Sequence, residues 1–284
     1  HTADFSMFRV YADADGNPAE YSTDNVPLKP KHYLPVNIGG VQENDFAMIL
    51  GYPGRTNRWM PAGGIDQNVK FAYPAWVEGS KTSMDVMKKH MNQSDAINLI
   101  YASKYASVAN YWKNRQGMID ALSKFGTAKS KSVQEDKFNK WANKKENKAK
   151  YGKVVSTINK YYTLTNEKSR HDNYLSQLVR TASYGVAPYI LGNALIAYYK
   201  ENDAKRAEML PKITGLIDNY YGDFYAPLEK EVLTAQLNLY AAKASEYGLA
   251  PVVAKMKETN KGNFAADVDK AITGSIFASK ESVE

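Results

Sequence analysis

The sequence predicts an α+β protein in which a short β segment precedes a large, irregular helical domain. Residues 1–64 contain aromatic and β-branched runs interrupted by Pro and Gly, which is typical of strands and turns. After residue 64, apolar residues recur at helical spacing. The chain has 284 residues, a length that suggests about two domains. We therefore expect one domain over residues 1–64 and a second over residues 65–284.

The composition is that of a folded globular protein, with 44% hydrophobic and 24% charged residues. No apolar run approaches the roughly 18 residues needed to cross a bilayer, so no membrane span is expected. The absence of Cys excludes disulfides, thiolate metal sites and cysteine nucleophiles. We expect neither a metal nor a cofactor.

The chain begins at His1 rather than at an initiator Met, and no basic-then-apolar signal segment precedes the first predicted strand. We therefore expect the sequence to be a piece of a longer polypeptide.

The first strand is predicted from Phe5 to Tyr11, and Asp4 stands where it begins. A carboxylate at the end of a rigid strand is well placed to act as a fixed charge in a cleft. The plain alternative is a surface Asp that flanks a strand.

The next segments are predicted to be turns, loops and one more strand. Residues 13–18 superficially resemble a calcium loop, but Pro18 replaces the sharp-turn Gly, and Asp24 is too short for the last ligand position. We interpret this segment as an Asp-Gly turn. Three Pro residues make residues 21–35 extended. A second strand is expected over residues 45–50.

A type II turn is predicted at Gly51–Gly54, where Pro is followed by Gly.

Helices are predicted for the remainder from periodicity and cap signals. The expected segments are Ser80–Met91, Ser94–Phe125, Ser132–Thr165, Ser169–Glu201, Asp203–Asn219, Pro227–Gly248 and Pro251–Thr259. Ser94 or Asp95 can cap the second of these helices, and Gly126 can end it. Pro188 should kink the helix that contains it.

Positive charge is concentrated between Lys124 and Lys153, where ten Lys face three acidic residues. The segment could bind nucleic acid or another polyanion, or it could be the solvated face of a long helix. It contains no Arg, and Phe138, Trp141 and Tyr151 recur near helical spacing, which predicts the buried stripe of that helix. We therefore favour the helix face and expect no nucleic-acid binding.

Asn110 lies on a stripe of the predicted Ser94–Phe125 helix that differs from the apolar one. Its neighbours on this stripe, at helical spacing, are Ser103, Ala106, Ser107, Asn114 and Gly117. Most of the neighbours are small, Lys113 being the exception, so another group can approach Asn110 closely. A carboxamide can hold an ammonium or a backbone group. The alternative is a helix–helix contact lined by small residues.

Four segments carry a resemblance to a known family. They are His1-Thr-Ala-Asp4-Phe-Ser-Met-Phe-Arg9, Tyr21-Ser-Thr-Asp-Asn25-Val-Pro27 with Pro30-Lys-His32, Gly51-Tyr-Pro-Gly-Arg55-Thr, and Ser107-Val-Ala-Asn110-Tyr-Trp-Lys113. Together they resemble the dipeptidyl-peptidase 7 and dipeptidyl-peptidase 11 family of bacterial serine exopeptidases.

The resemblance implies a chymotrypsin-type double β-barrel with a large helical cap. Residues 1–64 would then be part of the barrel and residues 65–284 the cap. The family's catalytic triad runs His, Asp, Ser along the chain, and Asp4 matches its Asp. The His would precede residue 1 and the Ser would follow Glu284. None of the four His residues matches the catalytic one, so this chain alone is expected to be inactive.

The resemblance also implies the ligand and the setting. Asn110 matches the Asn of the cap that holds the free amino terminus of the substrate. The partners would be peptides with a free amino terminus, which lose dipeptides one at a time. A homodimer in the periplasm or at the cell surface of a Gram-negative bacterium is implied as well.

Two other classes of function remain as alternatives. One is a non-catalytic helical module that binds a polyanion or a partner protein through the Lys-rich segment. The other is a purely structural domain, in which Asp4 and Asn110 are incidental polar residues.

Overall fold

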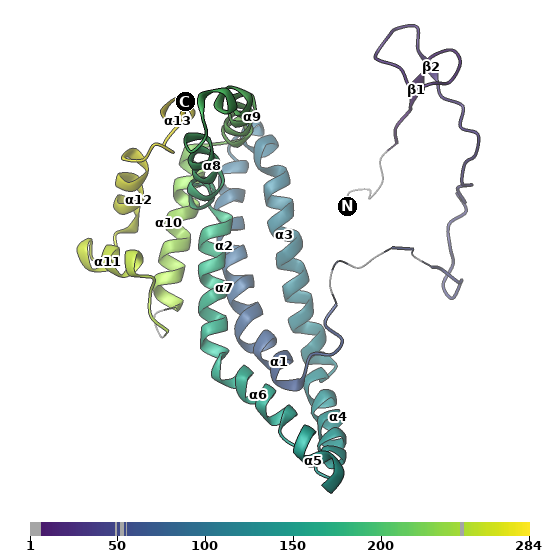
Figure 1. Ribbon diagram of the computed structural model, residues 1–284, viewed down its shortest axis with the longest axis vertical. Helices are drawn as coiled ribbons and strands as arrows, with labels where there is room; N and C mark the ends of the chain where they lie inside the picture. The colour runs from purple at the N-terminus through teal and green to yellow at the C-terminus, as the bar shows by residue number, and fades with distance from the viewer. Residues whose placement is uncertain (1–6, 49, 52–53, 55, 245–246) are drawn as a thin grey trace. The chain divides into compact units, whose positions relative to one another are not determined.

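The computed structural model describes residues 7–48, 50–51, 54, 56–244 and 247–284. Contacts between residues divide the chain into two units, His1–Thr56 and Asn57–Glu284. The second unit contains the described helices, and Figure 1 shows the course of the chain through each unit.

The described residues of the first unit form one short pair of strands, β1 (Tyr11–Ala12) and β2 (Val26–Pro27). They pair antiparallel, with Tyr11 opposite Pro27. The predicted Asp-Gly turn follows β1: the Asp13 carboxylate accepts hydrogen bonds from the backbone N–H groups of Asp15 and Asn17. Gly16 has a φ of +83°, in the region that favours glycine.

The part of a β-barrel expected over residues 1–64 is not present in the described residues. Of the predicted strands, residues 7–10, 45–48 and 50 form none, and large apolar side chains such as Phe8 and Phe46 are almost fully exposed. A barrel strand needs hydrogen-bonded neighbours, and an isolated two-stranded pair is marginally stable at best. Among the described residues before 57, the only strand pairing is that of β1 with β2, which is two residues long. The predicted turn at Gly51–Gly54 includes Tyr52 and Pro53, which lie outside the described residues.

The second unit is helical, as predicted for most of the chain (Figure 1). Its α-helices are α1 (Ala62–Gln67), α2 (Tyr73–Met91), α3 (Asp95–Lys124), α4 (Thr127–Ala142), α5 (Lys145–Tyr151), α6 (Val154–Leu164), α7 (Asn166–Thr181), α8 (Ser183–Tyr199), α9 (Asp203–Gly222), α10 (Ala226–Lys243), α11 (Pro251–Thr259), α12 (Phe264–Thr273) and α13 (Lys280–Val283). No described helix is both long enough and apolar enough to cross a bilayer.

A π-helical turn, η1 (Asn68–Ala72), joins α1 to α2 without a break. The amino end of α1 follows Pro61, which provides no side-chain cap. Side chains from two other helices take that role. The N–H of Ala62 donates to Glu135 of α4 at 2.6 Å, and the N–H of Gly63 donates to Asn159 of α6 at 3.0 Å.

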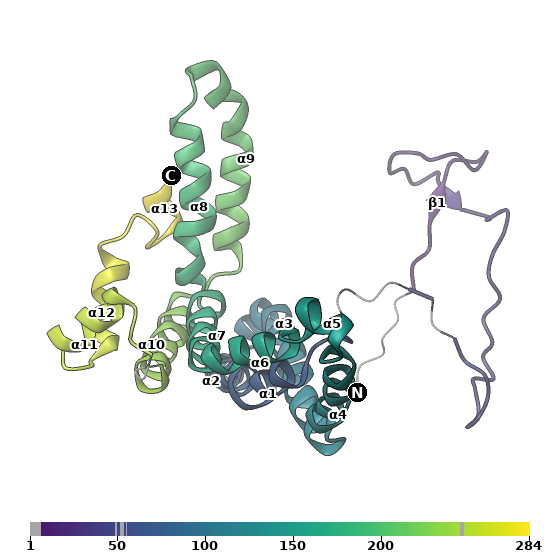
Figure 2. The same ribbon diagram turned by 60° about the horizontal axis from the view of Figure 1, so that its bottom comes forward.

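Helix α2 lies against α3, α7 and α10 (Figures 1 and 2). Buried Met87 and Met91 of α2, Tyr101 of α3, and Leu228 and Val232 of α10 form a core with Ala182. A glycine allows the close approach of α7. A Cβ on Gly79 would lie within 2.7 Å of two side-chain atoms of Gln177.

Helices α8 and α9 pack on each other around buried Leu191, Ile213 and Ile217, and α13 contacts α9 (Figure 2). A larger cluster joins α7, α10, α11 and α12. The prediction of α11 is confirmed, whereas α12 and α13 were not predicted.

The prediction of α3 is confirmed at both ends. Ser94 caps it by accepting a hydrogen bond from the N–H of Ile97, and Gly126 follows its last residues with a φ of +57°. The single helix predicted over Ser132–Thr165 is wrong, because α4, α5 and α6 occupy this region.

Asparagine side chains favour the break between α4 and α5. The amide of Asn143 donates to the carbonyl of Asn139, and the amide of Asn147 donates to the carbonyl of Trp141. These carbonyls lie at the end of α4, where helical partners run out. Phe138, Trp141 and Tyr151 were expected to form one buried stripe. Instead, the Trp141 ring contacts Phe138 within α4 and Tyr151 across the junction with α5, and Trp141 is 43% exposed.

The single helix predicted over Ser169–Glu201 is also wrong, because the chain breaks at Ala182 between α7 and α8. Ala182 is extended, with φ −93° and ψ 124°. The N–H of Ser183 donates to Glu229 of α10 at 2.6 Å instead of to a carbonyl of its own helix. Pro211 lies inside α9, and Pro227 is in the first turn of α10.

Candidate functional site

Asn110 lies on the exposed side of α3. The small-residue stripe predicted around it, Ser103, Ala106, Ser107, Asn114 and Gly117, is exposed throughout. A Cβ added to Gly117 would meet nothing within 4 Å. No described helix therefore covers the stripe, and the helix–helix contact considered as an alternative is not found among the described residues.

The opposite side of α3 fixes its rotation about its own axis. Tyr101 and Ala109 are buried, and Ile97, Ile100 and Val108 pack against the core shared with α2 and α10. Because successive residues of a helix are about 100° apart, burial of Tyr101 and Ala109 turns Asn110 toward the surface.

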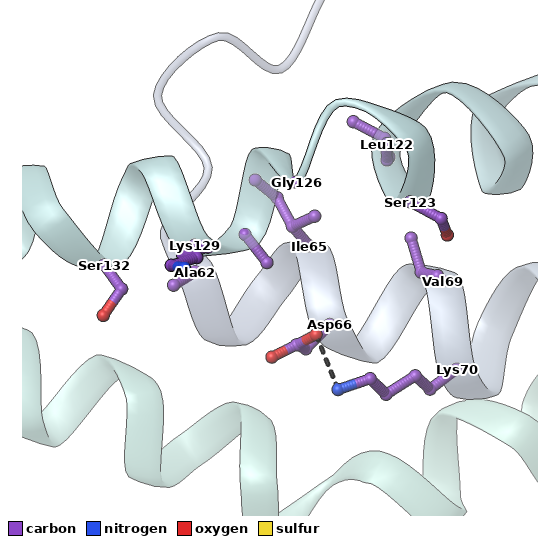
Figure 3. A pocket seen from close by; sticks show the side chains of 11 residues that line it. Ala62, Ile65, Asp66, Val69, Lys70, Leu122, Ser123, Gly126, Lys129 and Ser132 are labelled. Carbon is purple, nitrogen blue, oxygen red and sulfur yellow. Dashed lines mark ion pairs between the residues drawn. The ribbon is translucent and has the colours of Figure 1, made fainter.

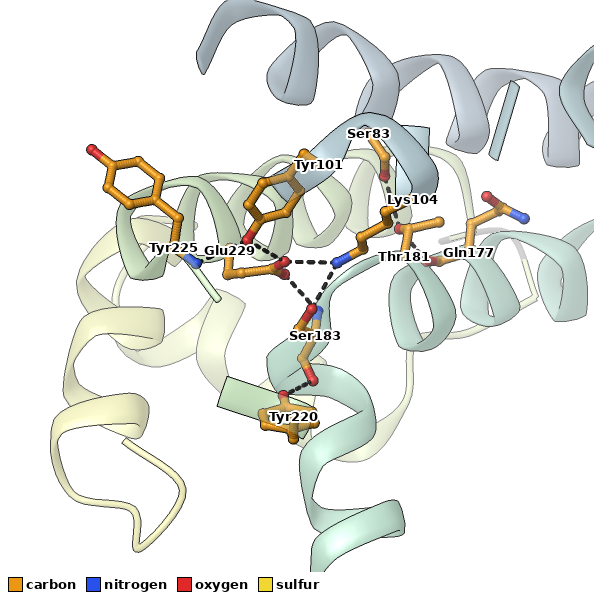
Figure 4. Close-up of polar contacts among 9 residues, drawn as sticks. All are labelled: Ser83, Tyr101, Lys104, Gln177, Thr181, Ser183, Tyr220, Tyr225 and Glu229. Carbon is orange, nitrogen blue, oxygen red and sulfur yellow. Dashed lines mark hydrogen bonds and ion pairs between the residues drawn. The ribbon is translucent and has the colours of Figure 1, made fainter. Parts of the chain in front are cut away.

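A buried carboxylate holds the first half of α3. Glu229 (Figure 4) lies in the first turn of α10. Its side chain is 0% exposed. One of its oxygens accepts from the Tyr101 hydroxyl at 2.9 Å and from Lys104 Nζ at 2.7 Å. The other accepts from the N–H of Ser183. The Tyr101 oxygen itself accepts from the N–H of Tyr225 at 3.0 Å. The carboxylate therefore links α3, α10 and the α7–α8 junction.

Two further hydrogen bonds complete this arrangement, which we call the Glu229 cluster. Lys104 Nζ also donates to the Ser183 hydroxyl at 2.7 Å, and the Tyr220 hydroxyl of α9 donates to the Ser183 carbonyl at 2.6 Å (Figure 4). Burial and the adjacent Glu229 carboxylate raise the pKa of Tyr101 far above its ordinary value. The Tyr101 hydroxyl therefore keeps its proton, and remains a donor to Glu229, above the pH at which an ordinary tyrosine ionises.

A polar seam continues between α2, α7 and α10. Ser80 donates to the Gln177 carbonyl oxygen at 3.1 Å, and Ser83 bonds to Thr181 at 2.8 Å. The Gln236 amide donates to the Gly79 carbonyl and to Ser83. All these side chains are buried, and their partners satisfy them.

A pocket of about 350 Å³ lies beside the Asn110 stripe, between α2, α3 and α7. Its lining consists of Trp76, Ser80, Ser107, Val108, Tyr111, Arg115, Gln177, Arg180 and Thr181. The Arg115 guanidinium lies 4.6 Å from the Tyr73 ring centre and 5.7 Å from that of Trp76. No carboxylate lines the pocket, so it presents positive charge next to Ser107, one turn from Asn110.

A second pocket, of about 490 Å³, lies between η1 with α1 and the turn from α3 to α4 (Figure 3). Its apolar lining includes Ile65, Val69 and Leu122. Asp66 and Lys70 form an ion pair at 2.8 Å, which neutralises both charges. This pocket therefore offers shape and apolar surface, with Lys129 as the remaining charged residue of its lining.

The histidines of the helical unit have structural partners. His90 Nε2 lies 2.8 Å from the Glu231 carboxylate, and His171 Nε2 lies 2.8 Å from the Tyr240 hydroxyl. Within the described part of the chain, no group of three or more His, Asp or Glu side chains could hold a metal ion. Asp4 and His1 lie outside the described residues.

The family model for peptidase S46 matches residues 1–284, the entire chain. This chain belongs to the peptidase S46 family. The resemblance predicted from four short segments is thereby confirmed.

Relatives of this S46 chain are dipeptidyl peptidases by name. It is 48% identical over 287 residues to dipeptidyl-peptidase 7 of Capnocytophaga gingivalis, covering 100% of this chain and 40% of that protein. It is 37% identical over 248 residues to the Asp/Glu-specific dipeptidyl-peptidase of Flavobacterium psychrophilum, covering 86% of this chain and 34% of that protein. The chain thus spans about two fifths of the length of the curated relatives it matches.

The helical fold of this S46 chain also has a solved counterpart. The crystal structure of Porphyromonas endodontalis DPP11 in complex with the dipeptide Arg-Glu matches it with a TM-score of 0.71 and 30% identity. The match covers 97% of this chain and 39% of that one.

Family membership weakens the polyanion-binding alternative for the S46 chain. The Lys-rich segment forms α4, α5 and the turn after them, and most of its Lys side chains are exposed. Lys131 donates to the Arg58 carbonyl at 2.6 Å. The charges are therefore distributed over solvated helix faces, as the favoured interpretation predicts.

Sequence reasoning missed the Glu229 cluster of the S46 chain. An acidic residue in the first turn of a helix is the usual complement to its dipole, so Glu229 looked ordinary. A signal was available in Tyr101 and Lys104, a hydroxyl and a cation three residues apart at the start of a largely apolar helix face. Such a pair on one face indicates a shared acidic partner.

Proposed function

We propose that this S46 chain supplies the helical cap and one triad residue of a serine dipeptidyl peptidase. The enzyme would release dipeptides from the free amino terminus of peptides. The observation that carries the proposal is the similarity, across the chain, to relatives named dipeptidyl-peptidase 7. The relative of known structure was solved with a dipeptide bound, which supports peptides as the ligand class.

The proposed enzyme has two parts. The segment before the helices, expected over residues 1–64, would contribute to a chymotrypsin-type barrel, and the helical unit, which includes α1 from Ala62 on, would form the cap. The almost fully exposed apolar side chains before residue 57 support this division, because such side chains need a surface to cover them. The chain by itself would be catalytically inactive, since it would hold one triad member only.

Asp4 is proposed as the triad Asp. Its carboxylate would accept a hydrogen bond from the catalytic His ring, fix the tautomer and stabilise the imidazolium during acyl transfer. In the full gene product that contains this chain, Asp4→Asn should lower kcat about ten-thousandfold. A loss smaller than about tenfold would remove Asp4 from the triad.

Asn110 is proposed to hold the substrate's ammonium group through its carbonyl oxygen. Its exposure, on a stripe of small side chains, supports this role because a peptide end can reach it. An ammonium held at a fixed distance from the nucleophile leaves room for two residues, which explains dipeptide release.

The test compares one peptide in free and N-acetylated forms with the full gene product. Stepwise dipeptide release from the free form alone is the expected result. Cleavage of both forms would keep a serine peptidase and reject the amino-terminal clamp. Cleavage of neither would favour the non-catalytic binding module.

A matched pair of variants then assigns the clamp. Asn110→Ala should lower kcat/KM for free-amine peptides on the order of tenfold or more, the effect of losing a charged hydrogen bond. Asn114→Ala, one turn further along the same exposed stripe, is the control and should change kcat/KM less than twofold, about the scatter expected for a surface substitution. Equal effects of the two variants would reject the assignment of Asn110.

The setting of the enzyme follows the family resemblance. We propose a homodimer in the periplasm or at the surface of a Gram-negative bacterium, without a cofactor. Light scattering of the purified gene product tests the dimer, and a monomeric mass at working concentration would contradict it. Cell fractionation tests the location.

A further inference from the structure

Asn110 lies on α3 beyond the polar contacts that hold the start of this helix, which also packs along α2. Asn110 is six residues beyond Lys104 and nine beyond Tyr101, all within the uninterrupted helix α3. At 1.5 Å per residue, six residues span roughly 9 Å. A continuous helix moves as a stiff rod over this distance. A shift at Tyr101 and Lys104 therefore displaces Asn110 as well.

The polar contacts of these two residues converge on Glu229. Tyr101 and Lys104 both bond to the same carboxylate oxygen, while apolar contacts of α3 with α2 are non-directional. Charge-assisted hydrogen bonds from two side chains of one helix specify both its rotation and its position along its axis. Because Glu229 is 0% exposed, water cannot take the place of these donors in the folded cap.

The neighbouring acid on the same helix has a different role. Glu231 of α10 forms ion pairs with Lys89 and His90, at 2.7 Å and 2.8 Å. Both partners belong to α2 and neither belongs to α3. It joins α10 to α2 without holding α3. The two carboxylates are thus a natural comparison within one helix.

We infer that Glu229 is a positioning residue, which fixes α3 through Tyr101 and Lys104 so that Asn110 meets the substrate's ammonium group. The inference rests on the proposed function, because it gives Glu229 a role through Asn110. Glu229 does not touch the peptide, being fully buried, and acts only through the helix.

The test is a double-mutant cycle in the full gene product, with Glu229→Gln, Asn110→Ala and the combination. Glu229→Gln preserves shape and removes the charge. On a free-amine peptide it should lower kcat/KM on the order of tenfold, mainly through KM, since small misplacements of binding groups are costly. The double variant should have about the same kcat/KM as Asn110→Ala alone. Without the Asn110 side chain, the position that Glu229 gives to α3 no longer affects binding of the ammonium group.

Two controls separate positioning from general damage. Glu231→Gln combined with Asn110→Ala should give losses that multiply, as independent sites do. If Glu229→Gln fails to fold, Tyr101→Phe replaces it in the same cycle, since it removes one hydrogen bond and retains the buried ring. Multiplying losses for Glu229→Gln, or for Tyr101→Phe in its place, would overturn the inference while leaving the clamp intact. An Asn110→Ala enzyme with unchanged kinetics would instead reject the clamp itself, and the positioning role with it.

Discussion

The carboxylate of Glu229 lies 2.7 Å from the ammonium group of Lys104, yet the two ends of this ion pair differ in exposure. The Glu229 side chain is 0% exposed, whereas that of Lys104 is 29% exposed. An acid buried to this degree depends on its partners, because water cannot solvate it. A Lys at the surface does not depend on the acid in the same way.

This asymmetry predicts which variant is more destabilising. Lys104→Met leaves a fully buried carboxylate without its cation and should lower the free energy of unfolding by about 3–5 kcal/mol. Glu229→Gln leaves Lys104 able to reach water and should cost less. Chemical denaturation of both variants is the measurement. A Glu229→Gln cost equal to or larger than that of Lys104→Met would contradict the prediction.

Close packing of α2 on α7 predicts opposite effects for two glycine variants. Gly79→Ala would place a Cβ 2.6 Å from the Gln177 side chain, so we expect a loss of about 1–3 kcal/mol in unfolding free energy. Gly117 is exposed and lies within α3, away from the helix ends, and a Cβ there would meet nothing within 4 Å. Gly117→Ala should therefore raise the free energy of unfolding by about 0.5–1 kcal/mol. Thermal unfolding of the two variants measures the difference, and stabilisation by Gly79→Ala would show that α7 does not approach α2 as described.

Buried tyrosines predict a loss of stability in alkali. Burial, with smaller contributions from Tyr221 and Glu229, raises the pKa of Tyr184 to about 12 from its ordinary 10.0, and burial also raises the pKa values of Tyr101 and Tyr220. Above pH 10 the unfolded chain releases these protons while the folded chain retains them. Stability present below pH 10 should therefore fall as the pH rises toward 12.

Tyrosinate absorbance across this pH range is the measurement. Buried tyrosines, Tyr101, Tyr184 and Tyr220 among them, should ionise late and together with unfolding. Titration of all tyrosines near pH 10 without unfolding would contradict the burial of this group.

Local signals in the sequence predicted several elements correctly, and tertiary contacts explain the errors. Helix α3 carries its own cap, its own stop and an apolar stripe, so its ends could be predicted. The break at Ala182 depends on Glu229, 46 residues from Ser183 along the chain, and no local pattern reports it. The separation of α4 from α5 did have a signal, since Asn143 and Asn147 compete for helix carbonyls.

The candidate site was predicted in part, for similar reasons. Periodicity placed Asn110 off the apolar face of α3, and its exposure follows from that placement. The pocket beside it combines residues of α2, α3 and α7, which only the packed helices bring together. The strands predicted before residue 57 are not formed by the residues that the structure describes there, because strand formation depends on partners that a local pattern cannot provide.

The π-helical turn at Asn68–Ala72 has a consequence for how the helical unit tolerates insertions and deletions. A π turn holds one residue more than the α turn it replaces, and that residue rotates everything before it by about 100°. Helix α1 meets α4 and α6, whereas α2 meets α3, α7 and α10. Deleting a single residue between 68 and 72 would restore a regular helix and turn Ala62 and Gly63 away from Glu135 and Asn159. The extra residue of the π turn therefore sets the rotation of α1 relative to α2, so that α1 can pack on α4 and α6 while α2 packs on α3, α7 and α10. A regular helix could not make both sets of contacts.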